Sequence, residues 1–193
     1  IIRRYYQALC EKRRAGETKK NISKLENLMQ QAQITVEDRK VIVEALKKEK
    51  ETDGKPAVAL ELPNGKIVTG STSDLLGAAA ALLNGIKALG EIEDDVKLIA
   101  KEAIEPIQIL KTNYLGSKNP RLHTDEILIA LSSTAAHNEN AKKAMSQLHK
   151  LKRCDAHSTV LLSSVDENIF KKLGIQLTCE PKYEHDGRKY HKL

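Results

Sequence analysis

Two polar loops of this 193-residue sequence carry side chains that could hold an anion. The first loop supplies three hydroxyl groups, on Ser71, Thr72 and Ser73. They precede a segment with helical periodicity, and the free N–H groups at a helix start attract phosphate or carboxylate. The second loop supplies two cations and an imidazole, on Lys118, Arg121 and His123. One hypothesis is therefore that both loops bind one anionic, phosphate-bearing small molecule. The alternative is that the hydroxyl groups only cap a helix and that Arg121 caps a carbonyl group or pairs with a nearby acid.

Acid–base, nucleophilic and metal chemistry have a few candidate residues. His157 or His123 could act as the acid or base of a transferase or hydrolase, and Cys154 could be a nucleophile activated by His157. Zinc has three candidate ligands, Cys154, His157 and Cys179. A buried cysteine, however, commonly packs as a small apolar residue. The sequence does not favour zinc, identifies no cofactor and leaves the catalytic residues open.

The elements that must position these residues follow a mixed α/β pattern. Residues 57–62 and 66–69 predict two strands, and the Asn-Gly pair between them predicts a hairpin turn. Ser71 and Asp74 have the spacing of a capping box, which predicts a helix opening there. The helix is apolar on one side and small on the other, which indicates a central helix packed on both sides.

Shorter apolar stretches complete the predicted fold. Strands are expected at residues 96–99, 158–162 and 175–179. Helices are expected at residues 101–114, 124–136, 140–151 and 164–174, the second capped by Thr124 and the last with a Ser164–Glu167 capping box. The order predicts an α/β (α+β) fold, a three-layer sandwich with a β-hairpin and a central helix. It is similar to the cytidine-deaminase-like topology. Residues 76–80 lack the zinc ligand and glutamate of those deaminases, which excludes that activity.

The chain divides into four predicted parts. Residues 1–50 read as a helical segment that continues a missing upstream domain, because helical periodicity is already present at Ile1. Residues 51–56 read as a linker, 57–181 as the α/β domain and 182–193 as a polar tail. Residues 1–55 hold 14 basic and 9 acidic side chains, so the net charge of +6 comes largely from solvated helix faces. This distribution does not favour nucleic-acid binding. Three cysteines and the lack of a long apolar run favour a cytoplasmic protein with no membrane contact.

Four segments resemble one bacterial protein family. These segments are residues 60–70, 115–123, 154–160 and 172–181, which together span most of the chain. The family is known as domain of unknown function 1846 or uncharacterised protein family 0371, and the likeness is to its C-terminal region. The resemblance implies a longer cytoplasmic protein that forms homo-oligomers and has no established activity. An accessory domain that binds an anionic molecule, a transferase- or hydrolase-type enzyme and an oligomerisation domain therefore all stay open.

Overall fold

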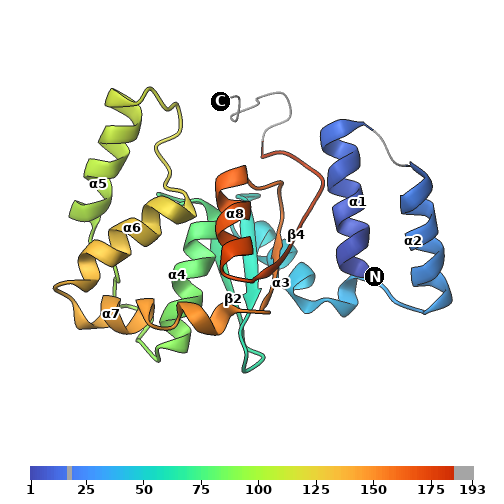
Figure 1. Ribbon diagram of the computed structural model, residues 1–193, viewed down its shortest axis with the longest axis horizontal. Coiled ribbons are helices and arrows are strands. Elements are labelled where there is room, and N and C mark those ends of the chain that lie inside the picture. The colour runs from blue at the N-terminus through green and yellow to red at the C-terminus, as the bar shows by residue number, and fades with distance from the viewer. Residues whose placement is uncertain (17–18, 185–193) are drawn as a thin grey trace.

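The computed structural model describes residues 1–16 and 19–184, which form a mixed α/β fold around a four-stranded sheet (Figure 1). The strand order is β2-β1-β3-β4. β1 is antiparallel to β2 and to β3, whereas β3 and β4 are parallel. The strands are β1 (Ala57–Glu61), β2 (Ile67–Ser71), β3 (Asp155–Ser158) and β4 (Gln176–Cys179). Most of the predicted polar tail, from residue 185 onward, lies outside the described residues.

The predicted hairpin and last strand are confirmed, but two other strand predictions are wrong. The sequence predicts a strand at residues 158–162, but β3 covers Asp155–Ser158. Its last paired residue, Ser158, lies opposite Val58. The Ser158 hydroxyl then donates to the Val160 carbonyl oxygen at 2.7 Å, and the chain turns away. Residues 96–99 form no strand. Leu98 and Ile99 are buried in the core, so this apolar run reflects side-chain packing rather than strand pairing.

Helices cover both faces of the sheet, which gives the predicted three layers. On one face, Val41 and Ala45 of the helix at residues 40–51 pack on Ala59. On the opposite face, Val58 and Leu60 pack against the central helix. Neighbouring strand residues point to opposite faces, so the two clusters lie on different sides. The helices before the sheet are α1 (Ile2–Ala15), α2 (Lys19–Gln31), η1 (Val36–Asp38) and α3 (Lys40–Glu51). The predicted linker at 51–56 thus joins α3 to a strand that α3 covers. The division of the chain into domains stays a prediction.

The central helix α4 (Gly77–Leu89) begins later than predicted, because its cap position is Leu76 rather than Ser71. Ser71 is still paired with Ala57 in β2, so it cannot open a helix, and the predicted Ser71–Asp74 capping box is wrong. The close approach predicted from the small residues is present. A Cβ atom at Gly70 would overlap the backbone nitrogen of Ala81.

The remaining helices form the outer layer and one crossover. α5 lies at the upper left of Figure 1, above α6 and α7, whereas the α1–α2 pair forms the right-hand end. α8 connects the parallel strands β3 and β4. These elements are α5 (Lys101–Ile109), the π-helix η2 (Leu110–Tyr114), α6 (Thr124–Ala135), α7 (Glu139–Met145), η3 (Leu148–Leu151) and α8 (Ser164–Lys172). Within the described ranges, every helix is too short or too polar to cross a membrane. The cytidine-deaminase-like topology stays a prediction.

Candidate functional site

One edge of the sheet brings several polar loops together. The parallel strands β3 and β4 end at this edge, and the antiparallel strand β1 begins there. The loop after β2 meets the loop before α6, because the backbone N–H of Leu76 donates to the Leu122 carbonyl oxygen at 3.1 Å. Leu75 and Leu122 form a parallel β-bridge at the same junction. Ligands of open α/β sheets commonly bind at the carboxyl ends of parallel strands. This edge is therefore the place to look for a functional site.

A histidine and a buried aspartate form a hydrogen-bonded pair at this edge. Nδ1 of His123, directly before α6, lies 2.8 Å from Oδ2 of Asp166 in the first turn of α8. Asp166 is 1% exposed, whereas the His123 side chain keeps 16% of its surface. An ionised carboxylate can only accept hydrogen bonds, so Nδ1 carries the proton. This pair is the His–carboxylate arrangement that orients a catalytic imidazole in many enzymes.

The Asp166 carboxylate is held by groups from two helix starts. Oδ1 accepts from the backbone N–H and the hydroxyl of Thr124, each at 2.9 Å. Oδ2 accepts from the Ser163 hydroxyl at 2.8 Å as well as from His123. Burial alone would raise the pKa of Asp166, but the hydrogen bonds from His123, Thr124 and Ser163 outweigh it and lower that pKa. The carboxylate is therefore a fixed negative charge beneath the imidazole.

A buried lysine fixes the loop that carries His123. Lys111 of η2 donates from Nζ to the Arg121 carbonyl oxygen at 2.6 Å and to Oε2 of Glu126 at 2.9 Å. The same Glu126 oxygen accepts from the backbone N–H of His123 at 2.7 Å. His123, rather than the predicted Thr124, thus occupies the cap position of α6. These contacts hold the backbone of His123 in place, in addition to the contact of its side chain with Asp166.

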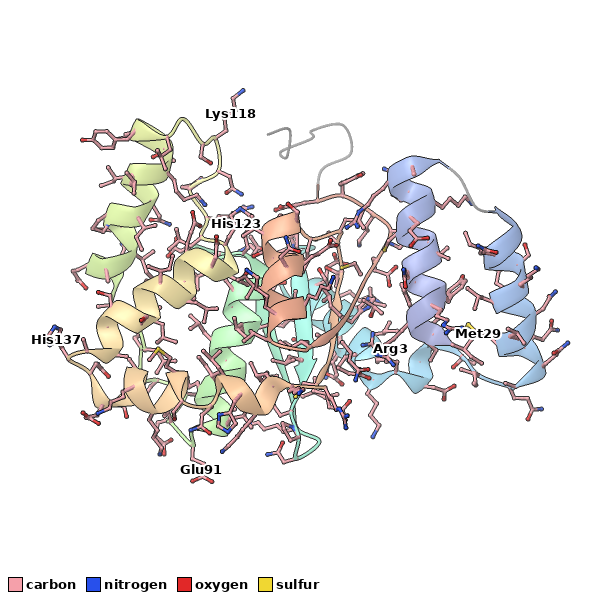
Figure 2. All side chains as sticks on the ribbon, viewed as in Figure 1. Arg3, Met29, Glu91, Lys118, His123 and His137 are labelled. Atoms are coloured by element: carbon pink, nitrogen blue, oxygen red, sulfur yellow. The ribbon has the colours of Figure 1, made fainter. Side chains whose placement is uncertain are left out.

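The two predicted cations of this loop differ in their surroundings. Nη1 of Arg121 pairs with Oε1 of Glu184 at 2.8 Å, beyond the end of β4. Lys118 is exposed and points outward, above His123 in the view of Figure 2. The structure thus places Arg121 and His123 at the same edge and leaves Lys118 at the outer end of their loop.

The hydroxyl groups of the first loop have local roles. Thr72 is buried, and its Oγ1 accepts from the backbone N–H of Gly77 at 3.2 Å and donates to the Pro56 carbonyl oxygen at 3.1 Å. Ser71 ends β2, and Ser73 is exposed. The loop lies beside the His123 loop, but the Thr72 hydroxyl is engaged in capping α4.

His157 lies in a different environment from His123. Its ring is fully buried, with Nδ1 2.8 Å from Oγ1 of Thr178 and Nε2 3.2 Å from Oε1 of Glu180. Tyr6 of α1 packs edge-on against this ring and donates to the same Glu180 oxygen at 3.0 Å. Burial lowers the pKa of His157, so the neutral form is favoured. This network joins α1 to the sheet and does not expose the imidazole to a substrate.

The three zinc candidates do not come together. Cys179 is at the end of β4 opposite Ser158, whereas Cys154 precedes the start of β3. His157 lies between them in register and faces Thr178, on the other side of the sheet from Cys179. Among the described residues, no three His, Cys, Asp or Glu side chains are grouped to hold a metal ion. Burial raises the pKa of the Cys154 thiol, which disfavours the reactive thiolate.

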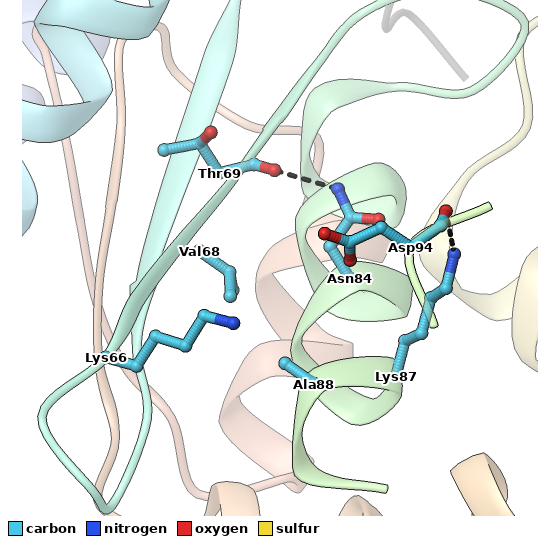
Figure 3. Close-up of a pocket in the computed structure, with 7 residues that line it drawn as sticks. All are labelled: Lys66, Val68, Thr69, Asn84, Lys87, Ala88 and Asp94. Atoms are coloured by element: carbon cyan, nitrogen blue, oxygen red, sulfur yellow. Dashed lines mark hydrogen bonds between the residues drawn. The ribbon is translucent and has the colours of Figure 1, made fainter. Parts of the chain in front are cut away.

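A shallow pocket lies between β2 and the second half of α4 (Figure 3). Its volume is about 350 Å³, and two of its polar side chains bond to the main chain. Asn84 donates to the Thr69 carbonyl oxygen at 2.8 Å, and Lys87 donates to that of Asp94 at 2.5 Å. The lining residues are Lys66, Val68, Thr69, Asn84, Lys87, Ala88 and Asp94. This pocket has no acid–base pair like that of His123 and Asp166.

Sequence reasoning missed the carboxylate and the hydroxyl that complete the His123 site. The Ser163-x-x-Asp166 spacing is itself a capping signal, but it competes with the Ser164–Glu167 spacing one residue later. The structure shows that Ser163 caps α8, so the predicted Ser164–Glu167 capping box is wrong. No local signal predicts that the Asp166 side chain also reaches the start of α6.

Together, the fold and this edge define a mixed α/β protein with a histidine–aspartate pair beside the ends of its parallel strands. Residues 37–188 match the model of a family described as "Domain of unknown function DUF1846, C-terminal". The chain belongs to this uncharacterised family, which confirms the resemblance found in the sequence.

Related proteins are named only as members of an uncharacterised family. The UPF0371 protein of Corynebacterium glutamicum is 50% identical over 185 residues, which are 95% of this chain and 37% of that protein. A UPF0371 protein of Streptococcus thermophilus is 51% identical over 187 residues, 96% of this chain and 38% of its own length. That of Streptococcus sanguinis is 51% identical over the whole chain and 39% of its own length. The chain thus spans less than two fifths of the relatives it matches.

Proposed function

We propose that this chain carries an acid–base site for an anionic small molecule, in an enzyme of the transferase or hydrolase type. His123 is the group that transfers a proton, and Asp166 is the residue that orients it. The observation that supports this most is the 2.8 Å contact between Nδ1 of His123 and an aspartate that is buried and fully hydrogen-bonded. A carboxylate on Nδ1 sets the tautomer, so that Nε2 is the nitrogen that would exchange a proton with a substrate.

The anionic substrate is inferred from the charge beside His123. The guanidinium of Arg121 is suited to bidentate contacts with carboxylate or phosphate. It already holds the Glu184 carboxylate, and its side chain is more than one third exposed, so a substrate anion could exchange with Glu184. Lys118 adds a positive charge on a flexible side chain at the outer end of the loop. The Thr72 hydroxyl caps α4, which argues for the Arg121 loop rather than the Ser71–Ser73 loop as the anion contact.

His157 is the weaker candidate for the acid–base role. Its ring is fully buried, whereas the His123 side chain keeps 16% of its surface exposed. Proton transfer to a substrate needs hydrogen-bond reach, which a partly exposed imidazole at the sheet edge offers and a buried one does not. The proposal therefore selects His123 from the two histidines that the sequence left open.

The test is hydrolysis of p-nitrophenyl phosphate and p-nitrophenyl acetate by the purified chain and three variants. His123→Asn and Asp166→Asn remove the base and its orienting charge. His149→Asn is the matched control, since His149 is exposed and bonds only the nearby Ser146 carbonyl oxygen. Loss of a general acid or base typically lowers the rate by about 10²–10⁴-fold. We expect that loss in the first two variants and none in the control. Equal rates in His123→Asn and His149→Asn, or no turnover of either ester, would contradict the proposal.

A further inference from the structure

Four large apolar side chains lie exposed where α5 passes into η2. Tyr114 is 78% exposed and Leu115 72%, while Ile109 and Leu110 are each 49% exposed. These four residues fall within seven consecutive positions, and we refer to them as the apolar tip. Single exposed apolar residues are ordinary on a protein surface, but a cluster of large ones marks an interaction site.

The helix that leads to the apolar tip is covered on one side only. Ala103, Ile104 and Ile107 of α5 pack partly buried against the main core, but no residue of α5 is fully buried and Ile109 is 49% exposed. Pro106 inside the helix removes a backbone donor. A helix this short is not stable in water without tertiary packing. The packing that α5 receives therefore ends before the apolar tip, where Ile109, Leu110 and Tyr114 stay exposed.

The apolar tip is nevertheless held in a defined orientation. The π-helix η2 turns Lys111 inward, where its ammonium group bonds to Arg121 and Glu126. Leu110, the neighbouring residue, stays half exposed. π-helical turns are rare and occur frequently at functional sites. The anchored Lys111 thus fixes where η2 joins the rest of the domain, next to the exposed Leu110.

We propose that the apolar tip is the docking surface for the region of the longer family proteins that lies outside this chain. The relatives match at least 95% of this chain, yet the match covers only 37% to 39% of their length. The other 61% to 63% of each protein is thus joined to a domain like this one and needs a surface to pack on.

The size of the apolar tip favours this occupant over a second copy of the chain. A stable complex between separate proteins buries about 800 Å² on each partner, from about 20–30 residues. Four side chains are far fewer than that. Attachment within one polypeptide raises the effective concentration to about the millimolar range, so a small surface is sufficient. The partner surface should be apolar at its centre and acidic at its rim, opposite the exposed Lys118 (Figure 2).

The docked region would lie beside the His123 loop, because Lys111 links η2 to the backbone of Arg121. It could therefore contribute residues to that site. The docking proposal itself does not depend on the acid–base role of His123, and its test measures no activity.

The test compares amide hydrogen exchange of residues 103–116 in this chain with that of the aligned segment in the intact Streptococcus thermophilus protein. Docking suppresses local opening, so we expect exchange at least about tenfold slower in the longer protein. Equal exchange in the two proteins would overturn the proposal. Protection that grows with the concentration of this chain alone would overturn it too, since it would assign the apolar tip to a second copy.

Two charge substitutions make the test specific. The test variant is Leu115→Lys, and the control variant is Leu28→Lys. Leu28 is 48% exposed on α2, at the opposite end of the molecule from α5 (Figure 1). In this chain, Leu115→Lys and Leu28→Lys should both leave the thermal midpoint unchanged, because both side chains are exposed. In the longer protein, only the substitution aligned with Leu115→Lys should restore fast exchange in the aligned tip segment. Unchanged protection in that variant would overturn the proposal.

Discussion

Replacing Asp166 by asparagine tests the central feature of the candidate site. The amide oxygen of asparagine can still accept from the backbone N–H and hydroxyl of Thr124, as Oδ1 of Asp166 does. The amide nitrogen, however, replaces Oδ2, which accepts from His123 and from Ser163. The variant keeps the shape of the side chain and removes only its charge and one acceptor.

The expected loss of stability follows from the hydrogen bonds that change. Hydrogen bonds to a charged group contribute about 1.5–3 kcal/mol each. The imidazole of His123 can change tautomer and the Ser163 hydroxyl can rotate, so part of this is recovered. We expect Asp166→Asn to lower the free energy of unfolding by about 2 kcal/mol at pH 7. The pKa of Asp166 in the folded state lies below its ordinary value of 3.8. The contribution of Asp166 to the free energy of unfolding is therefore complete above pH 3.8 and is lost as the pH falls through the folded-state pKa.

The assay is urea denaturation of both proteins at pH 7, 5 and 3. The difference between them should be constant from pH 7 to 5 and smaller at pH 3, because pH 3 lies below the ordinary pKa of 3.8 and the unfolded state then takes up a proton. The matched control is Asp125→Asn in the first turn of α6, where Asp125 accepts only from the adjacent Glu126 N–H. This substitution should cost less than about 1 kcal/mol, the usual contribution of an acid near a helix start. The reasoning is refuted if Asp166→Asn costs no more than Asp125→Asn, or if its cost is the same at pH 3 and 7.

Three further predictions concern stability. Burial lowers the pKa of His157, so the contribution of this histidine to stability is complete above the ordinary pKa of 6.5 and is lost as the pH falls below that value. The thermal midpoint should therefore drop between pH 7 and pH 5, and it should drop less in His157→Gln. Gly70→Ala should lower the free energy of unfolding by more than about 3 kcal/mol in urea denaturation, because the added Cβ overlaps the backbone of α4. Gly65 lies in open space with a φ of 79°, so Gly65→Ala should cost about 1–2 kcal/mol. Equal costs would contradict this packing. Lys111→Met should cost about 2–3 kcal/mol because it breaks a buried ion pair, and exposed Lys118→Met less than about 0.5 kcal/mol; similar losses would refute the anchoring role of Lys111.

The elements with strong local signals could be predicted from the sequence. The Asn-Gly turn sets the β1–β2 hairpin, and the small residues of α4 allow its approach to β2 at Gly70. The start of α4 could not be predicted, because the capping signal at Ser71 is overridden by the pairing of Ser71 with Ala57. The apolar run at 96–99 misled for a related reason, since its side chains are buried without any strand pairing.

The candidate site was predicted in part. The sequence places Arg121 and His123 in one polar loop, and the structure puts that loop at the edge of the sheet. Asp166 follows His123 by 43 residues, and its approach depends on how α8 packs against α6. A contact between two helix starts has no sequence period or motif, so only the tertiary structure reveals it.

The two histidine sites show why residue types alone could not rank the candidates. Each imidazole lies beside a carboxylate and a hydroxyl: His123 is close to Asp166 and Ser163, and His157 is close to Glu180 and Thr178. His157 is in the middle of the sheet on β3, so α1 covers it and burial favours its neutral form. His123 precedes a helix at the edge of the sheet, so part of its ring stays exposed while its aspartate is buried. Because the partners are of the same chemical types, only the place of each imidazole relative to the sheet separates the partly exposed His123, which we propose as the acid–base group, from the buried His157.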